Sequence, residues 1–166
     1  MSAPSDIATP DVGFVVDSVS FPIEEGKLRE FAIASGGDPD AVLAAGVLPP
    51  TFAAVAAHWR DQAAMVRVLQ LDIRRVVVGG SEWEYGAPAW IGDRLTGDRV
   101  VTDVAVKSSG MLILTLTTTL RREDGEVAVT QRDTVIQVPP KGSPGGLALR
   151  SGDLAQGARS PRSVGS

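Results

Sequence analysis

Three titratable side chains in the first half of the sequence are placed where they could transfer protons. Asp38 lies in the stretch SGGDPDAVLAAGVLPPTF (residues 35–52), and His58 and Asp61 lie in the segment HWRD soon after it. A carboxylate and an imidazole beside a reacting group can act as general acid and base. The stretch ends at the start of an expected helix, where free backbone N–H groups could polarise a carbonyl oxygen.

Each of these side chains also has a structural interpretation, and the sequence does not decide between the chemical role and the structural one. Asp38 precedes Pro39, so it is either a displaced catalytic acid or a turn residue that caps the short helix after it. His58, the only histidine, is either a general base or a histidine packed in the core or in an interface. Asp61 is either a reactive carboxylate or part of a solvated helix end.

A second group of residues could bind an apolar ligand. Four of the eight aromatic residues are tryptophan or tyrosine, and ligand sites are mostly apolar with a few polar groups. The alternative for these aromatics is packing in the core or in a dimer interface. The backbone N–H groups at the expected helix start could bind a carbonyl oxygen. The candidate binding residues are Thr51, Phe52, Trp59, Trp83, Tyr85 and Trp90.

Composition limits the possible classes of protein. The chain has 166 residues, of which 43% are hydrophobic, and its net charge is -4. The acidic balance disfavours nucleic-acid binding. The absence of cysteine excludes disulfides and thiolate sites, and a single histidine cannot form a His-rich metal site. We therefore expect no metal and no cofactor. We find neither a secretory signal nor an apolar run of about 20 residues, so we expect a cytoplasmic protein.

The first half of the chain predicts helices. A helix is expected in EEGKLREFAIASGG, which starts at Glu24, because apolar residues recur on one face and a Gly-Gly pair follows. A short helical piece should run from Pro39 through Ala45. A longer helix should run from Thr51 to about Val66, and its first two turns are apolar on all sides, as in a buried helix.

The second half predicts strands. Three long segments (residues 97–107, 111–122 and 126–138) are separated by SSG and EDG, which favour hairpin turns. In the middle segment Leu112, Leu114, Leu116 and Leu120 should share a core face. The fold class is α+β, with a long antiparallel sheet wrapped around one buried central helix. We expect a lead at residues 1–12, one domain at 13–139 and a flexible Gly/Ser/Pro-rich tail at 140–166.

The chain resembles the MaoC-like hydratase/dehydratase superfamily, and in particular its FAS1-like N-terminal dehydratase domain. The resemblance covers roughly residues 13 to 138 and is carried by EEGKLREFAIASGG, LPPTFAAV, EWEYGAPAWIGDRLT and DGEVAVTQRDTVIQV. In the third stretch the family's aromatic-acidic, proline and Gly-Asp positions are occupied by Glu84, Tyr85, Pro88, Gly92 and Asp93. The resemblance implies the hotdog fold.

The resemblance also implies an activity. Catalytic members hydrate a trans-2-enoyl thioester, or dehydrate an (R)-3-hydroxyacyl thioester, with an aspartate and a histidine in a loop reading roughly Asp-x-Asn-Pro-x-His. In this chain the aspartate position falls on Gly37, or on Asp38 with one shift, and the histidine position falls near Val42 or Leu43. Valine and leucine cannot transfer a proton, so we assign no catalytic residue to this chain.

The main hypothesis is that the chain is the non-catalytic half of a heteromeric hydratase or dehydratase, a lyase. Its partner would be a second MaoC-like hotdog subunit that carries the Asp/His pair. The substrate would be an acyl-CoA or acyl-carrier-protein thioester of fatty-acyl, steroid or polyketide metabolism. Two alternatives stay open. The first is a homo-oligomeric hotdog acyl-thioesterase that uses Asp61 or another carboxylate, and the second is a non-enzymatic module that binds acyl thioesters.

Overall fold

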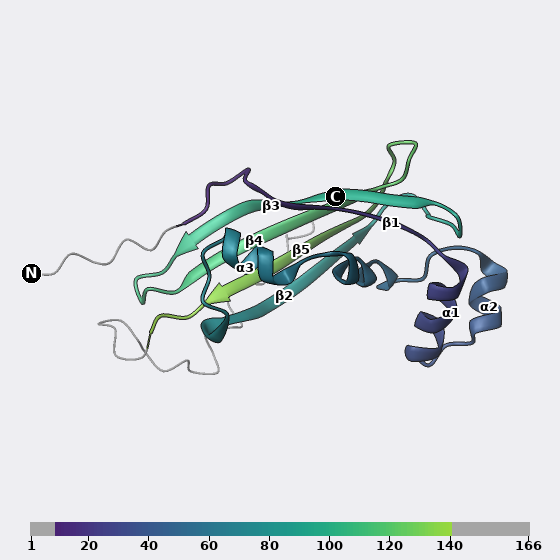
Figure 1. Ribbon diagram of the computed structural model, residues 1–166, viewed down its shortest axis with the longest axis horizontal. Helices are drawn as coiled ribbons and strands as arrows, with labels where there is room; N and C mark the ends of the chain where they lie inside the picture. The colour runs from purple at the N-terminus through teal and green to yellow at the C-terminus, as the bar shows by residue number, and fades with distance from the viewer. Residues whose placement is uncertain (1–8, 141–166) are drawn as a thin grey trace, which may run out of the picture.

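The computed structural model describes residues 9–140, and our expectations for residues 1–8 and 141–166 lie outside the described residues. Figure 1 shows five strands in one sheet, with the helices beside it. The elements in chain order are β1 (Val15–Pro22), α1 (Glu25–Ala34), α2 (Pro39–Ala45), the 3-10 helix η1 (Phe52–Trp59), α3 (Gln62–Val68), the 3-10 helix η2 (Ile73–Arg75), β2 (Val76–Tyr85), β3 (Arg94–Val106), β4 (Leu112–Arg121) and β5 (Val127–Gln137).

The sheet is antiparallel, with the strand order β1-β3-β4-β5-β2. The expected hairpins join β3 to β4 and β4 to β5. The burial of β4 alternates, so that its leucines face the core and the intervening residues are half-buried, as the sequence predicts. We call the face that carries these leucines and η1 the inner face. The α+β class is therefore confirmed.

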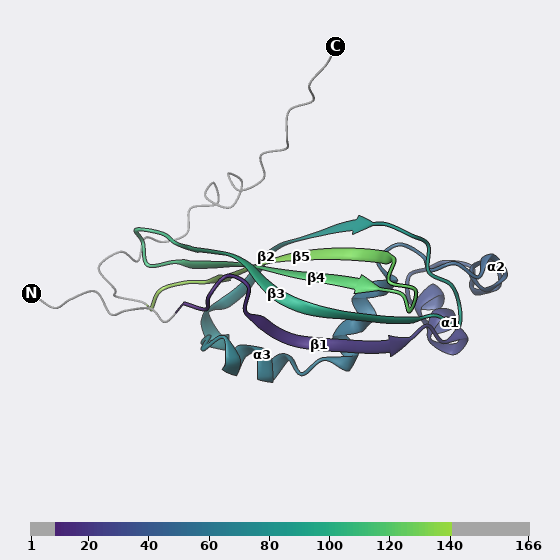
Figure 2. The same cartoon turned by 90° about the horizontal axis from the view of Figure 1, so that it is seen from above.

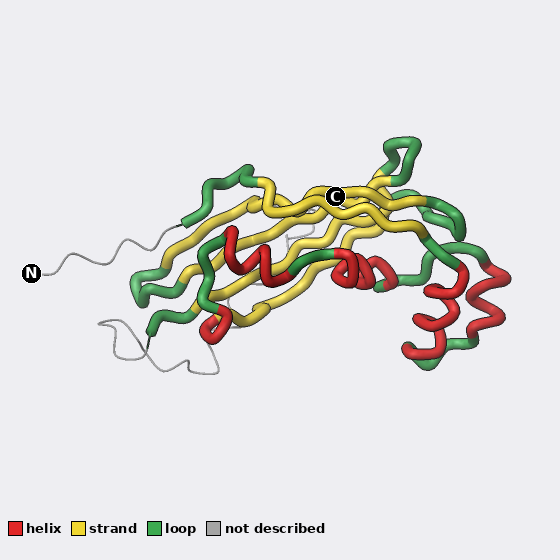
Figure 3. The backbone as a smooth tube through the Cα atoms, in the orientation of Figure 1, coloured by secondary structure: helices red, strands yellow, loops and turns green. Residues whose placement is uncertain are grey.

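Two short helices stand where the sequence predicts one. Arg60 has an extended backbone (φ -110°, ψ 144°) that ends η1. A new helix, α3, then begins, because the Asp61 carboxylate accepts a hydrogen bond from the backbone N–H of Ala64 at 2.9 Å. The expectation of one continuous helix from Thr51 to Val66 is therefore wrong, and Figure 3 shows the break between the two helices.

The expectation that this segment is buried on more than one side is also wrong. One side of η1 packs into the core through Phe52, Ala53 and Ala56. The opposite side, with Ala54 and Ala57, is exposed. Both η1 and α3 lie over β1, and Figure 2 shows α3 on the β1 side of the sheet, away from β2. The helices therefore cover the inner face unevenly.

The core consists of two apolar clusters on the inner face. One lies under η1 and includes Phe21, Phe52 and Leu95. The other lies towards α3 and includes Leu69 and Leu114. Among the described residues, no helix is both long enough and apolar enough to cross a membrane.

Candidate functional site

The inner face beside β2 is the part of the sheet that its own helices leave open. Strand β2 is largely exposed along its whole length, and the neighbouring Gln131 and Asp133 of β5 are only half-buried. Within residues 9–140 no strand pairs with the outer edge of β2. An open inner surface next to a free strand edge can receive a ligand, another protein chain, or both.

Thr51 and Tyr85 are brought together at one end of this surface. The Thr51 backbone N–H donates a hydrogen bond to the Tyr85 hydroxyl at 3.0 Å, and Tyr85 is 49% exposed. Thr51 has a φ of 67°, a left-handed conformation that is costly for a residue with a Cβ and that clusters at functional sites. The N–H that we expected to bind a substrate carbonyl thus holds the tyrosine hydroxyl.

The other candidate binding residues are distributed between core and surface. Phe52 is fully buried, and its N–H donates to the carbonyl of Pro49 at 3.2 Å. Trp83 is half-buried and packs against the core under η1. Trp59 is 37% exposed and stacks on Phe21 with the ring centroids 5.0 Å apart.

Trp90 lies outside the open surface beside β2. It is 44% exposed and sits in the turn before β3, where its N–H donates to the Asp93 carboxylate at 3.0 Å. The guanidinium of Arg122 lies against the same turn and donates to the carbonyl of Pro88 at 2.9 Å. This loop contains Pro88, Gly92 and Asp93, three of the positions that carry the resemblance to the MaoC-like proteins, and it is held to the end of β4.

The two aspartates both cap helices. The Asp38 carboxylate accepts from the N–H groups of Asp40 at 3.0 Å and Ala41 at 3.4 Å at the start of α2, as its structural interpretation predicts. Asp61 caps α3, and the hydrogen bond from the Ala64 N–H lowers the pKa of its carboxyl. Both carboxylates are thus engaged by backbone donors.

His58 is exposed on the outer side of η1, so its assignment to the core is wrong. The side chain leaves the core because positions 52, 53 and 56 form the buried side of η1. Its ring makes an edge contact with Trp59, with the centroids 5.3 Å apart. A place in an interface stays a prediction.

We did not predict from the sequence a row of polar side chains that crosses the inner face between the two apolar clusters. Cross-strand pairing aligns four of its members on β1, β3, β4 and β5 and, two residues along β5, a further pair with β2, and residues paired in this way lie on the same face of a sheet. We call this row the polar band. It consists of Asp17, Arg99, Thr118, Gln131, Asp133 and Ser81, with Arg60 above it.

Two buried guanidinium groups dominate the band electrostatically. The side chains of Arg99 and Arg60 are 5% and 4% exposed. Arg99 forms a bidentate ion pair with Asp17, and Arg60 donates to the Thr118 hydroxyl at 3.2 Å. Burial, and then the nearby Arg99, lower the pKa of Arg60, while the Asp17 and Asp133 carboxylates act in the opposite direction. The band therefore contains two cations, Arg60 and Arg99, and two anions, Asp17 and Asp133.

A signal for the band is present in the sequence. On β4, Thr118 interrupts a row of leucines at alternate positions, and on β3 Arg99 lies between the buried Leu95 and Val101. A polar residue on an otherwise apolar strand face needs a partner when it is buried. Such interruptions on adjacent strands indicate a polar row across a sheet.

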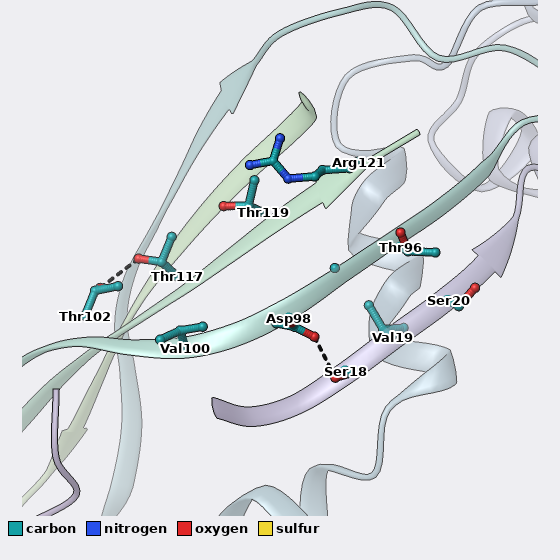
Figure 4. A pocket seen from close by; sticks show the side chains of 11 residues that line it. Ser18, Val19, Ser20, Thr96, Asp98, Val100, Thr102, Thr117, Thr119 and Arg121 are labelled. Carbon is teal, nitrogen blue, oxygen red and sulfur yellow. Dashed lines mark hydrogen bonds between the residues drawn. The ribbon is translucent and has the colours of Figure 1, made fainter. Parts of the chain in front are cut away.

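The opposite face of the sheet carries a different feature, shown in Figure 4. It is a shallow hollow of about 730 Å³ lined mainly by serine and threonine from β1, β3 and β4. Ser18 donates to Asp98 at 2.6 Å, and the hydroxyls of Thr102 and Thr117 lie 2.7 Å apart. None of the candidate residues from the sequence lines this hollow.

Comparisons with known proteins match most of the described residues. A sequence profile for the family "FAS1-like, dehydratase domain region" matches residues 10–131. The UPF0336 protein of Saccharopolyspora erythraea is 33% identical over 129 residues, which cover 70% of this chain and 81% of that protein.

Two solved structures are similar in fold. One is the C-terminally truncated HadBC (3R-hydroxyacyl-ACP dehydratase) complex from Mycobacterium tuberculosis, with a TM-score of 0.61, 21% identity, and coverage of 78% of this chain and 99% of that chain. The other is the (R)-hydratase from A. caviae involved in PHA biosynthesis, with a TM-score of 0.56, 20% identity, and coverage of 78% and 98%. The likeness shows that this chain has the hotdog fold.

Proposed function

The chain belongs to the FAS1-like dehydratase domain family, and from this premise we propose that it is the non-catalytic half of a heteromeric hydratase or dehydratase. The complex would hydrate an enoyl thioester or dehydrate an (R)-3-hydroxyacyl thioester. Its partner would be a second hotdog subunit that supplies the aspartate and the histidine. One structural neighbour, HadBC, is itself a dehydratase complex, which supports a heteromeric assembly.

The observation that carries the proposal is the loop between α1 and η1. The residues near the family's histidine position, Val42 and Leu43, pack against the core under η1. Of the two carboxylates in this segment, Asp38 is held by two backbone N–H groups as a helix cap, and Asp40 pairs with Arg29 at 3.1 Å. Since proton transfer needs a titratable group free to reach the substrate, this loop supports a chain whose chemistry comes from elsewhere.

The free edge of β2 supports a partner chain. Val77 and Val78 on this edge strand are 49% and 68% exposed. An exposed apolar edge invites strand pairing, and proteins normally cover or charge such edges. The strand is preceded by Arg74 and Arg75 and ends with two glutamates among its last four residues. An antiparallel partner strand with the same charge order would place opposite charges side by side.

We place the thioester carbonyl at Tyr85. The tyrosine hydroxyl accepts from the Thr51 N–H at 3.0 Å, so its own proton can be donated to a carbonyl oxygen. A hydroxyl that already accepts a hydrogen bond is a stronger donor, because such chains are cooperative. In this arrangement the start of η1 acts on the substrate through Tyr85.

The test is to assay the hydration of crotonyl-CoA by the purified chain, by a MaoC-like hotdog subunit of the same organism that carries the Asp/His pair, and by the two together. We expect activity from the pair and none from the chain alone. Replacing the partner's catalytic aspartate with asparagine should abolish the activity of the pair, and Asp38→Asn in this chain should leave it unchanged. Hydration by the lone chain, or loss of activity in Asp38→Asn, would contradict the proposal.

The same preparations separate the thioesterase alternative. Hydrolysis of acyl-CoA by the lone chain that disappears in Asp61→Asn would favour a homo-oligomeric thioesterase. The capping hydrogen bond at 2.9 Å predicts that this substitution affects helix α3 and no hydrolytic activity.

A further inference from the structure

The end of the polar band beside β2 forms a compact polar patch, which we define as Ser81, Gln131 and Asp133. The Asp133 carboxylate accepts from the Ser81 hydroxyl at 2.5 Å and from the Gln131 amide at 3.0 and 2.9 Å. A carboxylate has about four acceptor positions, so Asp133 can accept a further donor. The carboxylate is half-buried, and the main helix contacts with the sheet are to β1 at the other side of the inner face. The Arg60 guanidinium at the end of η1 interacts with it electrostatically.

The polar patch lies on the same face of the sheet as Tyr85. Residues 81, 83 and 85 alternate along β2, and their partners on β5 are residues 133, 131 and 129. Four residues at about 3.4 Å per residue place Ser81 about 14 Å from Tyr85. Trp83 lies between them and is half-buried. A ligand held at Tyr85 and extended along β2 would therefore cross an aromatic surface and then reach a carboxylate.

A carboxylate at that distance discriminates between ligands by chemistry. A plain alkyl chain laid over the polar patch would remove water from Asp133 and offer no hydrogen bond in return, which is costly for an ionised group. An acceptor such as a ketone could not bind the ionised carboxylate either. A hydroxyl would donate to it, and hydrogen bonds to charged groups are the stronger ones.

We propose that the polar patch selects an acyl group that carries a hydroxyl about 14 Å from the thioester carbonyl. This inference rests on the proposed function, which places the carbonyl at Tyr85. The patch determines which acyl group is accepted, and its residues do not take part in the addition of water. Sites built to bind a substrate hydroxyl reject analogues that lack it, because their buried polar groups are then left without a partner.

The test compares three substrates of the assembled complex: dodec-2-enoyl-CoA and its 11-hydroxy and 11-oxo derivatives. We expect kcat/KM for the hydroxy substrate to exceed the other two by about tenfold or more, as one charged hydrogen bond provides. Asp133→Leu should reduce this ratio to about one, whereas Ser81→Ala, which leaves the carboxylate with one donor fewer, should keep the ratio or raise it. A ratio of rates is unaffected by the fraction of protein that is folded.

The control variant is Asp98→Leu. Asp98 also accepts a serine hydroxyl across two strands, from Ser18 at 2.6 Å, but on the opposite face of the sheet. We expect Asp98→Leu to keep the wild-type ratio. A wild-type ratio near one, or an equal ratio in wild type and Asp133→Leu, would overturn the inference while leaving the proposed function intact.

Two further outcomes separate the remaining explanations. The same ratio should be found with N-acetylcysteamine thioesters. If the effect of Asp133→Leu disappears with these short thioesters, the polar patch recognises the pantetheine arm, and the inference is overturned. If the complex hydrates none of the substrates, the proposed function fails. In that case the dissociation constants of the three CoA thioesters from the complex test the inference, and the hydroxy thioester should bind more tightly than the other two by the same ratio.

Discussion

The polar band makes a quantitative prediction about Asp17. This carboxylate is the ion-pair partner of Arg99, whose side chain is 5% exposed, and it lies 3.7 Å from the buried Arg60. Asp17→Asn keeps the shape and removes the charge. Breaking a buried pair from one side costs about 3–5 kcal/mol, and since Asp17 is 23% exposed, we expect a loss of about 3 kcal/mol in the free energy of unfolding.

Urea denaturation of the purified chain measures this loss. With an m-value of about 2 kcal/mol/M, a loss of about 3 kcal/mol lowers the midpoint by about 1.5 M. The matched control is Asp98→Asn on the exposed outer face, where a hydrogen-bonded carboxylate should contribute under about 1 kcal/mol. Equal urea midpoints for Asp17→Asn and Asp98→Asn would contradict this expectation.

A double variant isolates the cause. Combining Asp17→Asn with Arg99→Met removes the cation that the first substitution leaves without its partner, so part of the lost stability should return. If the two substitutions acted independently, their losses in the free energy of unfolding would add. A double variant as unstable as the sum of the two single variants would show that the ion pair is not the origin of the loss.

Three further outcomes are expected. The pKa of Asp72 is lowered by hydrogen bonds from the two arginines that follow it closely, so Asp72→Asn should lower the melting temperature at pH 7. That difference should shrink as the pH falls below the ordinary aspartate value of about 3.9. Val78→Lys at the free edge of β2 should leave the lone chain folded and prevent formation of the complex in light scattering. Gly97→Ala should cost about 1–3 kcal/mol in urea denaturation, because a Cβ there would lie 2.3 Å from the Thr119 carbonyl oxygen.

Much of the fold could be predicted because the signals are local. The β4 leucines, the two hairpin turns and the Asp38 cap each depend on residues close in sequence. The break at Arg60 could not be predicted, since the residues from Thr51 to Val66 contain no proline or glycine. Helix η1 ends at Arg60, whose guanidinium donates a hydrogen bond to the Thr118 hydroxyl, 58 residues further along the chain.

The candidate site likewise has one part that the sequence predicts and another that it does not. The sequence was enough to predict that the loop after α1 lacks the family's proton-transfer pair, because valine and leucine stand near the histidine position that the resemblance implies. The contact of the Thr51 N–H with Tyr85, 34 residues away, and the polar band across the core became visible in the folded chain alone. These contacts depend on strand register and on which face the helices leave open, and both are set by packing between segments distant in the sequence.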